Sequence, residues 1–412
     1  MNLLRNSKVG IVSVALAASV GVAGLTAISA DAQATGHAAG GISVNSFTNN
    51  FSGMKALKPI ALAGKGKIAA IMPDTTSSTR YVEFDQPDIK AAALAAGLPA
   101  SDIITPQNAQ KSDTTFMTDV KADISNGAKV ILIDPEDPAT GVKAMEYAKS
   151  QGVAIVQYDR LSSGAGAVDT DPYVSFNNVT VGKLIGNGFV ACAKSWLHGK
   201  EPKFIEMHGA PTDNNATLFT DGYNSVLNPL EKAGKVKLLQ NTAGTWNPES
   251  PAPDALDEFK AAYTKLAANS TPPNSAVIPN DENGAPIITY LQSLHVAPRT
   301  FPMTGQDATL TGLDNILSGY QCGTVYKPIY KEAGAAVALA LYLRDGKAAP
   351  KSLLNGKTQD PSSKKQVPSV LETPEWVTAS TLKSTVVADK FVPVSKLCAA
   401  GYKADCTKYG IK

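Results

Sequence analysis

The sequence predicts an α/β protein of two lobes, each built on a parallel β-sheet with helices on both faces. Short apolar runs of strand length alternate with amphipathic stretches of helix length, which is the pattern of parallel sheets with crossover helices. About ten such units follow one another, more than one doubly wound sheet holds. The chain has 412 residues, against roughly 100–200 residues for an average domain.

The composition excludes several classes of protein. Hydrophobic residues make up 43% and charged residues 18% of the chain, which is not the composition of a disordered chain or a polytopic membrane protein. The formal net charge of +2 gives no sign of a nucleic-acid partner, and we expect none.

Residues 1–32 are predicted to be a signal peptide. Arg5 and Lys8 supply the positive start, an apolar run follows, and Ala30-Asp31-Ala32 fits a cleavage site. A retained membrane anchor is the alternative, since the run is nearly long enough to span a bilayer. Its many Ala, Gly and Ser residues favour cleavage. We therefore expect export to the periplasm or the extracytoplasmic face of the membrane.

The four cysteines should be oxidised after export. Cys398 and Cys406 are close in sequence and form the natural local pair. Cys192 and Cys322 then either pair with each other or remain buried free thiols, and the sequence leaves both open. No C-x-x-C motif is present, so neither a redox nor a zinc role is expected.

The elements follow in order after residues 33–66, which are rich in Gly, Ala, Ser and Asn and are predicted to be a linker. Residues 346–366, polar and containing Pro, Lys and Ser, are predicted to be a loop. Strands are expected at 67–72, 130–134, 153–158, 203–207, 236–240, 275–278, 300–304 and 323–326, and helices at 82–96, 139–150, 216–227, 255–268, 285–294 and 329–344.

Polar and aromatic residues recur after successive strands, where open α/β sheets bind ligands. Arg, Asp and Asn pair with sugar hydroxyls, which both donate and accept, and an aromatic ring stacks on the apolar face of a sugar. A phosphate would instead need unopposed cations or a helix-end amide cradle. The candidate ligand-binding residues are Arg80, Tyr81, Asp159, Arg160, Asn215, Trp246, Asn280, Asp307 and Lys327.

Each of these residues also has an ordinary explanation, and only their recurrence favours a site. Asp213 suits a helix N-cap, and Asp159-Arg160 suits a surface ion pair. Asp281 and Glu282 could form a glycosidase carboxylate pair, although capping or solvated roles are commoner. Hydrolase and nucleotide-binding motifs such as GxSxG, HExxH and the P-loop are absent from the sequence. We therefore expect binding without catalysis, and no cofactor or metal.

Five motifs stand out together in the sequence: Tyr158-Asp-Arg160, Tyr173-Val-Ser-Phe-Asn-Asn178, Asp213-Asn-Asn-Ala216, Gly305-Gln-Asp307 and Thr324-Val-Tyr-Lys-Pro328. Together they resemble the bacterial periplasmic D-xylose-binding proteins, of the type I sugar-binding group of ABC importers. The resemblance covers about residues 67–394. Tyr81 stands where those proteins carry Trp, and residues 75–79 and Pro279 also depart from the pattern.

The resemblance implies two Rossmann-like lobes joined by a three-strand hinge, the type I periplasmic binding protein fold. The implied N-lobe covers 67–176 with 328–356, the C-lobe 177–327 with 364–394, and a tail 395–412. Crossovers are implied near Asn177, near Lys327 and within 358–366.

It also implies a role for each candidate. Arg80, Arg160 and Lys327 would donate to the sugar. Asp159 would accept from it or orient Arg160. Asn215, Asn280 and Asp307 would bind from the C-lobe, and Trp246 and Tyr81 would stack. The implied function is to carry a monosaccharide, D-xylose or a related aldose, to an ABC permease as a monomer. A sugar sensor that presents its ligand to a receptor is the alternative, and a secreted carbohydrate-active enzyme is a more remote one.

Overall fold

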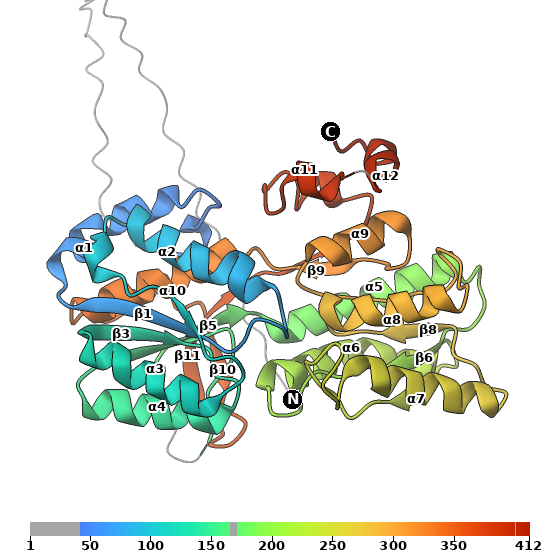
Figure 1. Ribbon diagram of the computed structural model, residues 1–412, viewed down its shortest axis with the longest axis horizontal. Coiled ribbons are helices and arrows are strands. Elements are labelled where there is room, and N and C mark those ends of the chain that lie inside the picture. The colour runs from blue at the N-terminus through green and yellow to red at the C-terminus, as the bar shows by residue number, and fades with distance from the viewer. Residues whose placement is uncertain (1–41, 165–170, 400) are drawn as a thin grey trace, which may run out of the picture. The chain divides into compact units, whose positions relative to one another are not determined.

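The computed structural model of the protein describes residues 42–164, 171–399 and 401–412 (Figure 1). The predicted signal peptide and residues 33–41 of the predicted linker lie outside the described residues. Among those described, no helix has the length and apolarity needed to cross a membrane.

The N-lobe is built on a seven-stranded sheet with the order β10-β11-β5-β4-β3-β1-β2. Its strands pair in parallel except for β10, which is antiparallel to β11. The sheet forms because its central strands are short, mostly apolar runs that are buried on both faces. The strands are β1 (Lys67–Met72), β2 (Gln107–Asn108), β3 (Ala128–Ile133), β4 (Ala154–Tyr158), β5 (Tyr173–Phe176), β10 (Gly356–Gln359) and β11 (Gln366–Glu372).

Helices cover both faces of this sheet (Figure 1). Alternate residues of each strand point to opposite faces, so Ile68 and Val130 join one core while Ile71 and Ile131 join the other. The first core contains helices α2 and α10, and the second contains α3 and α4. These helices are α2 (Gln86–Ala95), α3 (Asp113–Ser125), α4 (Pro138–Ser150) and α10 (Ile329–Arg344).

The described part of the predicted linker is instead part of the N-lobe, so that prediction is wrong. A 3-10 helix at Ser52–Leu57 leads into helix α1 (Lys58–Ala63). Phe47, Met54 and Leu57 are buried in the core that also holds α2 and α10. These apolar residues are widely spaced among Ser, Asn and Lys, and the segment therefore has the composition of a linker.

The C-lobe contains a parallel sheet of order β7-β6-β8 and an antiparallel pair β12-β9. Single bridges, Ala276 to Met303 and Gln306 to Val325, place residues 302–306 between β8 and β9. The predicted strand at 300–304 is reduced to these bridges, since Pro302 has no N–H for a ladder. The strands are β6 (Lys203–Glu206), β7 (Lys237–Asn241), β8 (Ser275–Val277), β9 (Thr324–Tyr326) and β12 (Glu375–Val377).

Five helices pack around the C-lobe strands. Helices α5 and α6 approach closely because two glycines meet: a Cβ on Gly182 would lie 2.1 Å from the carbonyl oxygen of Phe219, and one on Gly222 would lie 2.4 Å from that of Val179. The helices are α5 (Asn178–Trp196), α6 (Asn214–Lys232), α7 (Ala255–Ala268), α8 (Asp281–Ser293) and α9 (Leu310–Ser318).

Within the described residues the chain passes between the lobes at three places. The first lies at Asn177, between β5 and α5, and the second at Lys327, between β9 and α10. The third lies at Thr373-Pro374, because β11 pairs with β5 in the N-lobe and β12 pairs with β9 in the C-lobe. The expected crossover within 358–366 is therefore wrong, and residues 364–372 belong to the N-lobe rather than the C-lobe.

The C-terminal tail is part of the C-lobe. Helices α11 (Val394–Leu397) and α12 (Lys403–Lys408) follow one another, and Leu397 and Ile411 are buried in the same core as α9. Both candidate disulfides are formed, Cys398 with Cys406 and Cys192 with Cys322. The second bond excludes the alternative of two free thiols.

Candidate ligand-binding site

All nine candidate residues line a single cavity between the lobes. The N-lobe contributes four of them and the C-lobe another four, and Lys327 lies at the second crossover. The cavity holds about 320 Å³ of free space, counting its mouth, which is at the small end of ligand pockets. It lies beyond the carboxyl ends of β1, β4, β6, β8 and β9, as the strand-end argument predicts. The role of each residue toward a ligand stays a prediction.

Five further residues that are not among the sequence-predicted binding residues line the cavity: Ser77, Ser78, Asp213, Phe219 and Gln306. Phe219 lies four residues after Asn215, one turn along α6, so helical spacing could have identified it. Ser77 and Ser78 lie in the segment that departs from the family pattern, and no sequence signal marks them.

Arg80 is held in a buried cluster of carboxylates. Its Nε and Nη2 donate to Asp85 at 2.9 and 2.7 Å, Nη2 also donates to Glu332 at 2.6 Å, and Nη1 donates to Asp159 at 3.1 Å. The backbone that follows Arg80 forms a π-helix at Tyr81–Asp85 before α2 begins, and this turn brings Arg80 and Asp85 together. Most of the donors of Arg80 are therefore occupied by carboxylates of its own lobe.

Burial raises the pKa of Glu332 to about 8, with Arg80 opposing that rise and Asp159 and Asp85 adding to it. Three carboxylates around one guanidinium would be an excess of buried negative charge. A protonated Glu332 reduces this excess at neutral pH.

Asp159 stays ionised in spite of its burial. Burial alone would raise its pKa, but the charges of Arg80, Lys327 and Arg160 outweigh that effect and lower the pKa. Tyr81 donates its hydroxyl to Oδ2 of Asp159 at 3.1 Å. The backbone of Asp159 has φ +52°, a left-handed conformation that non-glycine residues adopt mainly where the surrounding structure enforces it. Asp159 is therefore a fixed, charged hydrogen-bond acceptor at the cavity wall.

Arg160 is surrounded by three other carboxylates. Its Nη1 donates to Glu136 at 2.6 Å, and its Nε lies 3.8 Å from Asp134 and 3.7 Å from Asp213. The guanidinium carbons of Arg160 and Arg80 lie 5.8 and 5.6 Å from the centre of the Tyr81 ring. The ring is thus polarised by two cations, which limits how much of it remains for stacking on a ligand.

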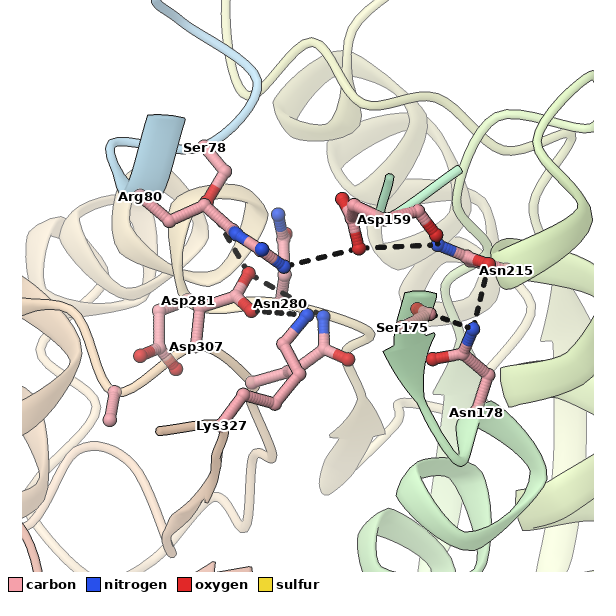
Figure 2. A network of polar contacts seen from close by, with 12 residues as sticks. Ser78, Arg80, Asp159, Ser175, Asn178, Asn215, Asn280, Asp281, Asp307 and Lys327 are labelled. Atoms are coloured by element: carbon pink, nitrogen blue, oxygen red, sulfur yellow. Dashed lines mark hydrogen bonds and ion pairs between the residues drawn. The ribbon is translucent and has the colours of Figure 1, made fainter. Parts of the chain in front are cut away.

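Asn215 joins the lobes beside Asp159 (Figure 2). Its Nδ2 donates to the carbonyl of Asp159 at 2.9 Å, and its Oδ1 accepts from Tyr173 at 3.1 Å and from Asn178 at 2.7 Å. Because Tyr173 and Asp159 belong to the N-lobe and Asn215 to the C-lobe, the bonds to those two residues cross the interlobe gap, whereas the bond from Asn178 lies within the C-lobe.

On the C-lobe side, Lys327 and Asp307 form an ion pair of 2.8 Å. Asp307 also has a left-handed backbone, with φ +90°. Asn280 accepts from the N–H of Asn283 at 3.0 Å, which caps α8, and it donates to the carbonyl of Ser77 at 3.3 Å. A capping residue thus contacts the opposite lobe as well.

Trp246 forms an aromatic wall whose orientation is fixed from three sides. Its indole Nε1 donates to Asp213 at 2.9 Å, and its ring meets Phe219 edge-on with 6.4 Å between centroids. A Cβ on Gly209 would lie 2.2 Å from the ring. Asp213 caps α6 by accepting from the N–H of Asn215 at 2.8 Å, so the expected cap is present and also holds the indole.

No group of three or more His, Cys, Asp or Glu side chains arranged to hold a metal occurs among the residues that the structure describes. The cavity instead combines charged donors, charged acceptors and aromatic faces.

The sequence profile of a family described as the periplasmic binding protein domain matches residues 68–348. The chain belongs to this family. The D-xylose-binding periplasmic protein of Escherichia coli K12 is 32% identical over 294 residues, which cover 71% of this chain and 82% of that protein. The multiple sugar-binding periplasmic receptor of Rhizobium radiobacter is 28% identical over 353 residues, 82% of this chain and 94% of that one.

Solved structures show the same fold for this periplasmic binding protein. An ABC transporter solute-binding protein from Clostridium phytofermentans, solved with β-D-glucose, has a TM-score of 0.68 and 23% identity over 80% of this chain and 99% of that chain. The predicted fold class and family are therefore confirmed. The relatives are binding proteins, so the prediction that this chain is not an enzyme is also confirmed.

Proposed function

We propose that this protein is the exported sugar-binding component of an ABC importer. It binds one uncharged aldose, D-xylose or a close relative, between its lobes, and its ligand-bound form is recognised by a membrane permease. The observation that carries the proposal is the cavity itself, where buried Asp, Arg, Asn and Lys side chains meet the Trp246 ring.

This set of groups matches a neutral polyol. Asp159 and Asp307 offer acceptors, and Arg160 and Lys327 offer donors. Neighbouring side chains fix these groups in place. Because charges of both signs alternate around the wall, a charged ligand would meet a like charge wherever it bound. A hydroxyl can pair with either sign.

The energetics are sufficient for micromolar binding. A hydrogen bond to a charged group contributes roughly 1.5–3 kcal/mol, and a micromolar dissociation constant needs about 8 kcal/mol. A few such bonds and one stacking contact therefore suffice after the cost of closing the lobes. A sugar that lacks one hydroxyl would leave a buried Asp or Asn unpaired. The site would therefore bind such a sugar more weakly than one that carries the hydroxyl.

The relatives favour a pentose or a similar aldose. Two relatives at 32% identity are named as D-xylose-binding proteins, from Escherichia coli and Haemophilus influenzae. A second candidate function follows from the relative named as a multiple sugar-binding receptor: the protein would present its sugar to a sensor instead of a permease.

A thermal-shift screen over pentoses and hexoses, followed by calorimetry of the hits, tests the proposal, since a ligand raises the melting temperature by mass action. We expect D-xylose or a close relative to give the largest shift. A screen in which no neutral monosaccharide shifts the transition would contradict the proposal. Reconstituted transport with a candidate permease, compared with binding to a receptor domain, separates the two functions.

A further inference from the structure

The N-lobe segment 74–79 closes against the C-lobe beside the cavity. Asp74 shapes this segment: its Oδ1 accepts from the N–H groups of Thr76 and Ser77, both at 2.6 Å. The resulting turn presents Ser78 and Thr79 to the start of α8 in the other lobe.

Glu282, the second residue of α8, receives this segment. Its Oε1 accepts from the backbone N–H of Thr79 at 2.9 Å, from the Thr79 hydroxyl at 3.2 Å and from the Ser78 hydroxyl at 3.4 Å. All of these contacts cross between the lobes. Glu282 itself is not among the residues that line the cavity, so a ligand there would not touch it.

Asp281, the residue before Glu282, has a different set of contacts. Both oxygens of Asp281 are engaged inside the C-lobe, with Gln321 at 2.7 Å, Thr324 at 3.0 and 3.1 Å and the N–H of Thr309 at 3.0 Å. Asp281 is therefore held within the C-lobe, and it does not line the cavity. The two residues do not form the catalytic pair that their adjacency in the sequence allowed.

We propose that Glu282 is a positioning residue that fastens segment 74–79 to the C-lobe and sets ligand affinity without contacting the ligand. The inference rests on the proposed function. The Glu282–Thr79 bonds exist only when the lobes meet, so they raise the population of the closed state. Apparent affinity scales with the population of the binding-competent state. Losing the fastening should therefore weaken every ligand by the same factor and leave the ranking of ligands unchanged.

The decisive comparison is Glu282→Gln against Glu282→Met. Both side chains are neutral and similar in length, but only Gln keeps an acceptor at the position of Oε1. With Met, the Thr79 N–H loses its partner. Because Thr79 is exposed, water can replace that partner, and the loss costs about 0.5–1.5 kcal/mol, which corresponds to roughly two- to tenfold in affinity. The same two changes at the exposed Glu83 of the N-lobe serve as the matched control.

Calorimetry of each variant with several sugars gives the first readout. We expect Glu282→Met to bind each sugar at least about twofold more weakly than Glu282→Gln, with constant ratios between sugars and faster dissociation in stopped flow. Equal affinities for the two variants would overturn the proposal. So would a changed ranking of sugars, since that would make Glu282 a contact residue.

A second readout does not depend on knowing the ligand. Spin labels at Lys90→Cys in α2 and Lys265→Cys in α7, both exposed positions, report the distance between the lobes, and the four native cysteines are occupied in disulfides. We expect Glu282→Met to shift the distance distribution of the unliganded protein to longer values than Glu282→Gln. If no sugar binds the unaltered protein but this shift occurs, the proposed function fails while the fastening stands. An unchanged distribution refutes the fastening.

Discussion

The ammonium group of Lys327 lies 2.8 Å from Oδ1 of Asp307, and both residues are almost completely buried. Lys327 also helps to keep the pKa of Asp159 low on the opposite wall of the cavity. One cation at the second crossover therefore balances an acceptor in each lobe. Removing one partner of a buried ion pair typically costs about 3–5 kcal/mol, because the other charge is left uncompensated.

Lys327→Gln should lower both the melting temperature and the sugar affinity, the latter by at least a hundredfold. Scanning calorimetry and titration calorimetry measure the two effects. Lys347→Gln is the matched control, since Lys347 pairs with Asp345 at 2.6 Å but its side chain is 58% exposed. Exposed pairs contribute about 0–1 kcal/mol, so this variant should match the unaltered protein. Equal effects at both positions would contradict the assigned role of Lys327.

Gly209→Ala should displace the indole of Trp246, because the new Cβ would lie 2.2 Å from the ring. We expect a fold that remains cooperative, a changed tryptophan fluorescence spectrum and a loss of most sugar affinity. Gly401→Ala makes the same change where no atom lies within 4 Å of the added methyl group, and it should bind normally. Normal sugar binding by Gly209→Ala would show that the indole is not part of the site.

Arg160→Ala should abolish measurable sugar binding, and so should Asp307→Ala. In the first variant the ligand loses a charged donor, and Asp134, Glu136 and Asp213 lose their shared cation. The melting temperature of Arg160→Ala should therefore also fall. The control is Arg299→Ala. Arg299 donates to the Tyr409 hydroxyl, away from the cavity. Undiminished binding in both cavity variants would refute the site.

Sugar affinity should weaken as the pH rises from about 5 to 8. Burial in the closed state, together with the charges of Asp307 and Asp281, raises the pKa of Glu282 to about 8. Parting the lobes removes the cover of segment 74–79, so the pKa of Glu282 falls toward its ordinary value near 4.3. The closed form therefore takes up a proton. Its extra stability is complete below the ordinary pKa and is lost as the pH passes through about 8.

Calorimetry in buffers of different ionisation enthalpy measures this proton uptake, which should approach one proton per sugar near pH 6. Glu282→Gln removes the titrating group, so its affinity should vary much less with pH. A Gln variant with the same pH profile as the unaltered protein would assign the dependence to another group.

The two disulfides should contribute unequally to stability. The bond between Cys192 and Cys322 spans 130 residues, and that between Cys398 and Cys406 spans 8. Loop-closure entropy gives about 5 kcal/mol for the first and about 2.5 kcal/mol for the second. Double Cys→Ala variants measured by denaturant unfolding should follow this order, and the reverse order would indicate that strain or residual structure dominates.

The alternation of strands and helices was predictable because each central strand is a continuous apolar run, as at Val130–Ile133. The fold of segment 42–64 was not predictable. Met54 and Leu57 can be recognised as core residues only once the surface of α2 and α10 that they cover is known. The same holds for β11, whose Gln, Pro and Ser residues do not have a strand composition. Pairing with β5 makes it a strand.

The site residues that directly follow a strand could be predicted from the sequence. Asp159 and Lys327 follow strands directly, so the topology alone brings them together. Ser77 and Ser78 lie in a turn whose shape depends on hydrogen bonds to Asp74, and no strand end fixes their position. The sequence also could not separate residues that face the ligand from those that hold them: Arg80 was expected to donate to the sugar, yet its N–H groups are largely taken by Asp85, Asp159 and Glu332.

The position of the third crossover has a practical consequence for protein engineering. Only Thr373 and Pro374 separate β11 in one lobe from β12 in the other, and the other two links are Asn177 alone and Lys327 with Pro328. A chimaera that combines one half of this protein with the other half of a relative must therefore be spliced at three junctions at once. A single fusion point would place strands of one parent in a sheet of the other. The number of residues at each junction must also be kept, since one inserted residue would turn Trp376 of β12 to the wrong face.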